Sequence, residues 1–206
     1  MHDMFVRPSG VAGERGLRTM AQAGRGMALE AVALLGIDAP RARMLEIGFG
    51  PGVGLEVLLN SFSQGEVVGV DPSEASHRHA ATRNAAAIAR GRLHLLSGTA
   101  EALPLPDEQF DGAIFVDNLH FWPDPRAGLA EVRRVLRDGA PVVCAFTPPS
   151  GGPPARLRRL FETAGFSEIT EPRSVHGSLL RAIHRVLPED RMPQPGDVRQ
   201  APDHLA

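Results

Sequence analysis

A glycine-rich loop that leaves an apolar strand and opens a helix constrains this chain more than any other feature. The apolar run at 44–47 leads directly into Gly-Phe-Gly-Pro-Gly at 48–52, and a helical pattern follows over 53–62. Glycines in such a loop permit positive φ angles and let a ligand approach the backbone with no Cβ in the way. The loop therefore predicts a nucleotide-type ligand at the helix N-terminus, at the carboxyl edge of a sheet. A tight structural turn without a ligand is the alternative.

Strands and helices alternate along the middle of the chain. Apolar runs predict strands at 44–47, 67–70, 93–97, 113–116 and 142–146, and helical patterns cover 53–62, 73–88, 129–136 and 157–164. This alternation implies βαβ crossovers and a doubly wound, mainly parallel α/β sheet with helices on both faces. Two last strands at 168–170 and 179–183 are joined by about eight residues, too few for a helical crossover. We therefore expect seven strands, with an antiparallel last strand.

Three parts are expected along the chain. Residues 1–40 form an N-terminal part, with a mobile or loosely helical arm over 1–26 and a helix from about 20 to 35. Met4 and Phe5 make the arm a candidate lid, and a disordered arm is the alternative. Residues 41–186 form the ligand-binding domain. Residues 187–206 contain four prolines and few apolar side chains, which is typical of a tail outside the core.

Composition excludes several classes of function. The chain has 22 basic and 24 acidic residues, for a formal net charge of −2, which argues against a general nucleic-acid binder. All basic residues are arginine, so lysine-dependent P-loop and Schiff-base enzymes are excluded. Cys144 is the only cysteine, and His77 and His79 diverge on a predicted helix, so no metal site is expected. No signal peptide or membrane-spanning stretch is recognisable, and the arginine-rich, lysine-free composition is typical of a G+C-rich bacterium; we expect a cytoplasmic bacterial protein that does not bind membranes.

Two carboxylates accompany the glycine loop. Asp71 ends the second predicted strand, where a carboxylate can accept hydrogen bonds from both hydroxyls of a ribose. The segment Asp71-Pro72-Ser73-Glu74 also fits a helix start with Asp71 as the N-cap, and one residue cannot easily serve both purposes. Glu46, just before the first glycine, would attract a cationic amino group and repel a dinucleotide pyrophosphate. That position favours S-adenosylmethionine (SAM) over NAD.

Five segments resemble the motifs of class I SAM-dependent methyltransferases, in the branch that includes the quinone-biosynthesis enzymes. They are MLEIGFGPG at 44–52, VGVD at 68–71, SGTAEALP at 97–104, FDGA at 110–113 and RVLRDG at 134–139. The resemblance extends from about residue 43 to 185 and is specific for the cofactor, but hardly for the methyl acceptor. It implies a Rossmann-like fold and SAM as cofactor.

The resemblance also assigns cofactor-binding residues. They are Glu46, Gly48, Phe49, Gly50, Gly52, Asp71, Pro72, Thr99, Ala100 and Asp117. Glu46, the glycine loop and Asp117 would hold the methionine moiety, Asp71 the ribose, and Thr99 with Ala100 the adenine. Thr99 departs from the family, which usually has an aspartate there; its hydroxyl can accept a hydrogen bond but carries no charge.

The acceptor side is predicted from the segment after the fourth strand. His120 is the candidate general base, because an imidazole titrates near neutral pH; the alternative is that His120 only lines the pocket or packs at a helix start. Phe121 and Trp122 would form a wall for a flat or apolar molecule; the alternative is that this aromatic pair packs in the core. We expect methyl transfer to an oxygen, nitrogen or carbon atom of a small, partly apolar metabolite. The alternatives are a SAM-binding cyclase scaffold or binding module that does not methylate and, less favoured, an NAD-dependent oxidoreductase.

Overall fold

The computed structural model describes residues 10–186, with the backbone alone for residues 22 and 23. Its strands are β1 (Arg43–Ile47), β2 (Glu66–Val70), β3 (Leu93–Leu96), β4 (Gly112–Val116), β5 (Pro141–Phe146), β6 (Phe166–Thr170) and β7 (Ser178–His184). Its helices are α1 (Gly10–Leu35), α2 (Val53–Ser61), α3 (Glu74–Arg83), α4 (Ala85–Ala89), α5 (Pro125–Val135) and α6 (Leu157–Thr163), with 3-10 turns η2 (Leu119–Phe121) and η3 (Pro148–Ser150). No helix in this part of the chain is long and apolar enough to cross a membrane.

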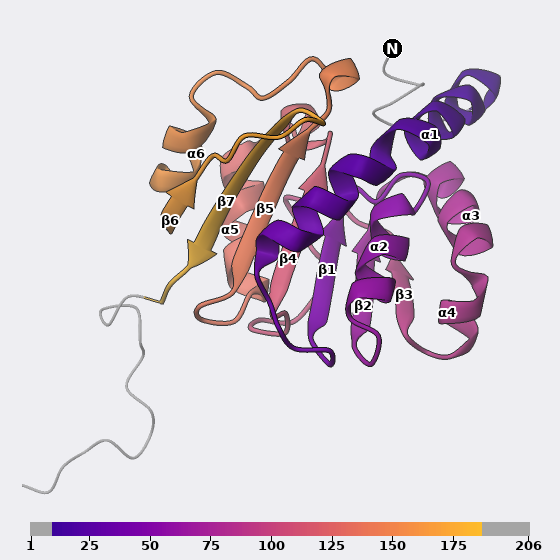
Figure 1. Cartoon of the computed structure of the whole chain (residues 1–206), viewed down its shortest axis with the longest axis horizontal. Helices are drawn as coiled ribbons and strands as arrows, with labels where there is room; N and C mark the ends of the chain where they lie inside the picture. The colour runs from indigo at the N-terminus through magenta and orange to yellow at the C-terminus, as the bar shows by residue number, and fades with distance from the viewer. Residues whose placement is uncertain (1–9, 187–206) are drawn as a thin grey trace, which may run out of the picture.

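The strands form one seven-stranded sheet in the order β3-β2-β1-β4-β5-β7-β6 (Figure 1). The pairs β1/β2, β1/β4, β2/β3 and β4/β5 are parallel, whereas β7 is antiparallel to both β5 and β6. The order reverses direction between β1 and β4, which is the switch point where doubly wound sheets bind ligands. The predicted fold class, including the antiparallel last strand, is confirmed.

Two apolar clusters hold the layers together, one on each face of the sheet. The first packs α5 and α6 against the sheet and includes Leu129, Val132 and Phe161. The second packs α1 and α2 against the opposite face and includes Met27 and Leu58. Because both faces of the sheet are covered, β5 is buried at all six positions and its sequence has no polar alternation.

The helix α1 begins about ten residues earlier than the sequence pattern indicates. Its C-terminal half follows the expected rule, since Met27, Ala31 and Leu35 recur every fourth residue and are fully buried. Its N-terminal half is rich in glycine, which disfavours a helix in isolation. Packing of Leu17, which is also fully buried, offsets that cost. The part of residues 1–26 that the structure describes is thus a regular helix; Met4 and Phe5, and the tail at 187–206, lie outside the described residues.

The single helix predicted over 73–88 is two helices, α3 and α4, separated at Asn84. Asn84 is buried, and its side-chain amide donates hydrogen bonds to the carbonyl oxygens of Gly52 and Ala80, both at 3.1 Å. An asparagine that binds neighbouring backbone carbonyls competes with the helix. The break therefore anchors the end of the glycine loop to the outer helix layer.

Candidate active site at the carboxyl edge of the sheet

The polar residues of the site follow strands whose carboxyl ends meet at one edge of the sheet. The glycine loop follows β1, Asp71 follows β2, Asp117 follows β4 and Thr147 follows β5. Backbone hydrogen bonds extend the ladders into these segments, with Gly48 N donating to Val70 O at 2.7 Å. Parallel strands bring these residues together although they are about 100 positions apart in the chain.

A cavity of about 230 Å³ opens at this edge. Its lining includes five of the predicted cofactor-binding residues, namely Glu46, Gly48, Phe49, Gly50 and Asp117. Residues from α1 and from the connection after β5 complete the wall, among them Thr19, Met20, Gly24, Ala28, Thr147, Pro149 and Ser150. Sequence reasoning missed these residues, because no local pattern indicates that α1 reaches the glycine loop.

Glu46 is the buried acid of the cavity, with 3% of its surface exposed. Its Oε2 atom has no hydrogen-bond partner among residues 10–186. Burial raises the pKa of this carboxyl group well above its ordinary value, the nearby Asp71 carboxylate raises it further, and a hydrogen bond from the Leu55 N–H opposes both. An unpartnered acid beside a cavity is suited to receive a cationic group, because the ion pair would repay its desolvation.

Two glycines of the loop are required by their neighbours. Gly48 has φ 68°, and a Cβ there would overlap the Asn118 amide. That amide donates to the carbonyl oxygen of Ile47, which ties the segment after β4 to the loop. A Cβ on Gly54, in the first turn of α2, would overlap the Glu46 carboxylate. The motif therefore makes room for side chains of the site as well as for a ligand.

Asp71 is buried and accepts two backbone hydrogen bonds. Its Oδ2 accepts from Gly50 N at 2.9 Å, and its Oδ1 accepts from Ser73 N at 2.8 Å. The helix α3 begins at Glu74 with Ser73 as its N-cap, whose hydroxyl accepts from Ser76 N at 3.3 Å. The alternative in which Asp71 caps this helix is therefore wrong: Asp71 holds the glycine loop against the end of β2. Burial raises the pKa of its carboxyl group, and the two backbone donors oppose that shift.

Asp117 is held in the left-handed region, with φ 56°, by the residue after β5. Its Oδ1 accepts from Thr147 N and its Oδ2 from Thr147 Oγ1, both at 2.6 Å. A left-handed aspartate is uncommon and costs about 1 kcal/mol or more, so the surrounding bonds must hold it in place. The pair joins the ends of β4 and β5 beside the cavity.

The other predicted cofactor-binding residues lie outside the lining of this cavity. Gly52 is the N-cap of α2 at φ 78° and packs against Ala80. Pro72 is exposed at the end of β2, and Ala100 is buried. Thr99 is half-buried in the loop after β3, where it forms an isolated bridge with Ala102. Their assignments to the cofactor stay predictions.

His120 lies beside a different cavity, of about 470 Å³, which Leu119 also lines. Both ring nitrogens are covered and have no hydrogen-bond partner among the described residues. The ring packs on Phe121 and Phe146, with centroids 3.9 and 5.5 Å away. Burial lowers the pKa of the imidazole, although Asp117 opposes the shift, so the ring is neutral near pH 7. Its neighbour Phe121 faces the glycine-loop cavity instead.

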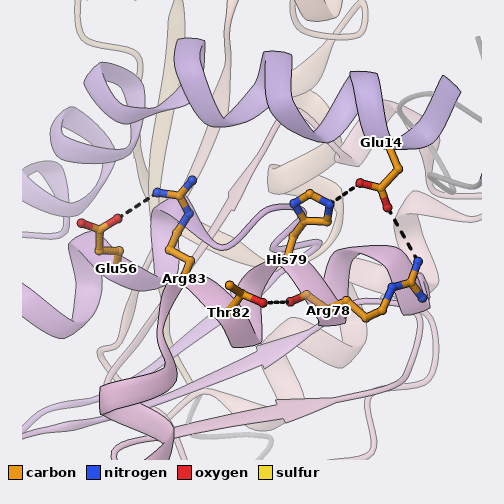
Figure 2. Close-up of a pocket in the computed structure, with 6 residues that line it drawn as sticks. All are labelled: Glu14, Glu56, Arg78, His79, Thr82 and Arg83. Atoms are coloured by element: carbon orange, nitrogen blue, oxygen red, sulfur yellow. Dashed lines mark hydrogen bonds and ion pairs between the residues drawn. The ribbon is translucent and has the colours of Figure 1, made fainter. Parts of the chain in front are cut away.

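A polar cluster fixes α1 over α3 and α2. Figure 2 shows α1 crossing above α3, with Glu14 and His79 pointing toward each other across the gap. Glu14 Oε2 lies 2.6 Å from His79 Nε2, and Glu56 of α2 pairs with both Arg25 of α1 and Arg83 of α3, at 3.1 and 3.2 Å. Exposed pairs of this kind are individually weak, and their sum restrains the helix rather than stabilising the core. The cluster thus positions the part of α1 that lines the site.

Comparison with known proteins identifies the domain. Residues 45–144 match the family model described as a methyltransferase domain. The chain is 29% identical to the uncharacterized methyltransferase YdaC of Bacillus subtilis over 134 residues, which cover 61% of this chain and 72% of that protein. It is 27% identical over 106 residues to 2-methyl-6-phytyl-1,4-hydroquinone methyltransferase 1 of Oryza sativa, covering 52% of this chain and 31% of the rice protein.

The fold is also similar to that of solved SAM-dependent methyltransferases. A SAM-dependent methyltransferase from Aquifex aeolicus superposes with a TM-score of 0.67 at 17% identity, covering 82% of this chain and 96% of the other. The sequence-based resemblance, including the quinone-biosynthesis branch, is confirmed by these matches. Residues 45–144 thus form a methyltransferase domain, in a chain with the class I fold of SAM-dependent methyltransferases.

Proposed function

We propose that the protein transfers the methyl group of SAM to an oxygen, nitrogen or carbon atom of a small, partly apolar metabolite. The observation that carries the proposal is Glu46, a buried carboxyl group with an unpartnered oxygen on the wall of the glycine-loop cavity. A cationic amino group, such as that of the methionine moiety, is the partner that such a group lacks. Asp117 and the backbone of the glycine loop would hold the rest of that moiety.

SAM supplies a sulfonium-bound methyl group that a nucleophile displaces directly. The protein would contribute alignment of the two reactants, exclusion of water and a low-dielectric wall. Val116, Phe121 and Pro149 provide apolar surface around the glycine-loop cavity, and Met20 of α1 lies close above Gly50. This lining supports a metabolite with an apolar body, and it supports the proposal that α1 acts as a cover.

The assignment of His120 as general base stays a prediction. In favour of it, the imidazole is neutral and its segment adjoins the cavity through Phe121. Because both ring nitrogens are covered, the ring must turn before it can accept a proton from a bound acceptor. If it acts as the base, His120→Ala lowers turnover by about 10²–10⁴-fold while SAM affinity is unchanged. A turnover close to that of the wild type would assign His120 to the pocket wall.

Two experiments test the proposal. Calorimetry with SAM, S-adenosylhomocysteine and NAD should show binding of the first two only; binding of NAD alone would overturn it. Incubation with methyl-labelled SAM and a set of hydroquinones, fatty acids and small amines should transfer label to one class. Tight SAM binding without transfer to any class would favour a cyclase scaffold or a binding module on the same fold. A cytoplasmic location in a bacterial cell stays an expectation.

A further inference from the structure

Three arginines surround the cavity beside His120. Arg126 lies in the first turn of α5, Arg156 precedes α6 and Arg159 lies in its first turn. None of the three guanidinium groups forms an ion pair or hydrogen bond with any residue from 10 to 186. Asp124, the acid nearest in sequence to Arg126, uses its carboxylate to cap α5. Like charges gathered at one opening repel one another unless an anion lies between them.

The neighbouring Arg158 shows that these arginines differ from an ordinary helix face. Arg158 also lies in α6, but it does not line the cavity, and its Nε atom lies 3.0 Å from Glu171 Oε1. Of the arginines at 156, 158 and 159, only Arg156 and Arg159 line the cavity and have no ion-pair partner among residues 10–186.

The backbone at Arg156 is in the left-handed region, with φ 65° and ψ 32°. A bulky residue in that region is strained, and residues in such conformations cluster at ligand-binding sites. Here the conformation places Arg156 on the cavity wall. Leu119, Leu160 and three further apolar residues, Pro125, Pro154 and Ala155, line the same cavity.

The cavity beside His120, called the arginine-lined cavity below, and the glycine-loop cavity are lined by neighbouring residues of two chain segments. His120 faces the former and Phe121 the latter. In the connection from β5 to α6, Pro149 and Ser150 line the glycine-loop cavity, and Arg156 lines the arginine-lined cavity. Phe121 is 36% exposed, which makes it one of the few exposed large apolar residues of the described chain. Neighbouring residues of the same two segments therefore line the two cavities, and the exposed ring of Phe121 is next in sequence to His120.

We infer that the arginine-lined cavity binds an anionic group, a carboxylate or a phosphate, on the apolar methyl acceptor of this enzyme. Guanidinium groups recognise both anions by paired hydrogen bonds. The identification of the bound molecule as the methyl acceptor rests on the proposed function. The binding of an anion in this cavity does not depend on it. It narrows the acceptor class from a partly apolar metabolite to an amphiphilic acid.

Trp122 allows binding to be measured without turnover. It is the only tryptophan of the chain and lies two residues after His120. The full-length protein, saturated with S-adenosylhomocysteine, is titrated with octanoate, octyl phosphate and octanol, and its fluorescence is followed. We expect at least one of the two anions to bind about tenfold more tightly than octanol, and added salt to reduce that preference. The tighter anion identifies the group. Equal binding of all three probes, or binding of none, would overturn the inference.

Matched variants locate the site. The double substitution Arg156→Gln and Arg159→Gln should weaken binding of the tighter anion by about tenfold or more, and leave octanol binding unchanged. Arg158→Gln removes one charge from the same helix and should leave all three affinities unchanged. All three side chains are exposed, so the variants should melt at the wild-type temperature. Wild-type anion affinity in the double variant refutes the inference. A failure of the proposed function gives a different result, namely that the wild-type protein does not bind S-adenosylhomocysteine.

Discussion

Binding of SAM should release a proton from Glu46, and the burial of this side chain sets the direction of the effect. Glu46 is 3% exposed, and burial together with Asp71 raises the pKa of its carboxyl group well above the ordinary value of 4.5. In the free protein the group therefore keeps its proton to a higher pH than an ordinary glutamate does, whereas an ion pair with a cationic amino group requires the carboxylate. Below the raised pKa, SAM affinity should fall about tenfold for each unit by which the pH is lowered.

The substitution Glu46→Gln tests this reasoning. It removes a charge-assisted contact of about 1.5–3 kcal/mol, which corresponds to roughly a 10- to 150-fold loss of affinity. Calorimetry between about pH 5 and about pH 8, in buffers of different ionisation enthalpy, should show proton release in the wild type and none in the variant. Wild-type affinity in the variant, or a dissociation constant of the wild type that does not change with pH, would refute the assignment of Glu46.

The stability of the ligand-free protein should depend on pH with the opposite sign. Because the folded-state pKa of Glu46 is raised, its contribution to the free energy of unfolding is largest below about pH 4.5 and is lost as the pH rises through the folded-state value. The carboxyl group of Asp71 has a raised pKa and contributes in the same direction. Denaturant unfolding should therefore show a steeper loss of stability with pH in the wild type than in Glu46→Gln.

Three further substitutions test the geometry around the cavity. Gly54→Ala should improve helix propensity by about 1 kcal/mol, but displace the Glu46 carboxylate and weaken SAM binding; unchanged affinity in calorimetry would contradict the overlap. Asp71→Asn should lower the free energy of unfolding by about 2 kcal/mol, measured by urea titration. The carboxylate accepts hydrogen bonds from the N–H groups of Gly50 and Ser73, and the amide NH2 group of asparagine cannot accept one of them. Thr147→Val should cost about 1–2 kcal/mol, since it removes the hydroxyl that donates to Asp117; an unchanged urea midpoint would show that this bond contributes nothing.

The order of strands and helices along the chain, and the place of the ligand loop in it, can be predicted from the amino-acid sequence. Hydrophobic runs such as 142–146 predict strands because a strand covered on both faces must be apolar throughout. The loop at 48–52 is recognisable because it needs positive φ angles and close approach to the backbone, which glycine allows and few other residues do. The short connection before β7 predicted its reversed direction from length alone.

Which side chains contact one another at the site depends on the tertiary structure. The glycines in the first half of α1 disfavour a helix by local propensity. The packing of Leu17 and the contacts with α3 stabilise this half as a helix, and it forms part of the cavity wall. No sequence pattern relates Thr147 to Asp117, because the bond depends on the lateral pairing of β4 with β5. For the same reason the sequence placed His120 and the glycine loop at one edge of the sheet, but the assignment of His120 to a separate cavity required the packing of its ring against Phe146. Local propensity acts over a few residues, whereas contacts across a sheet depend on the register between distant strands.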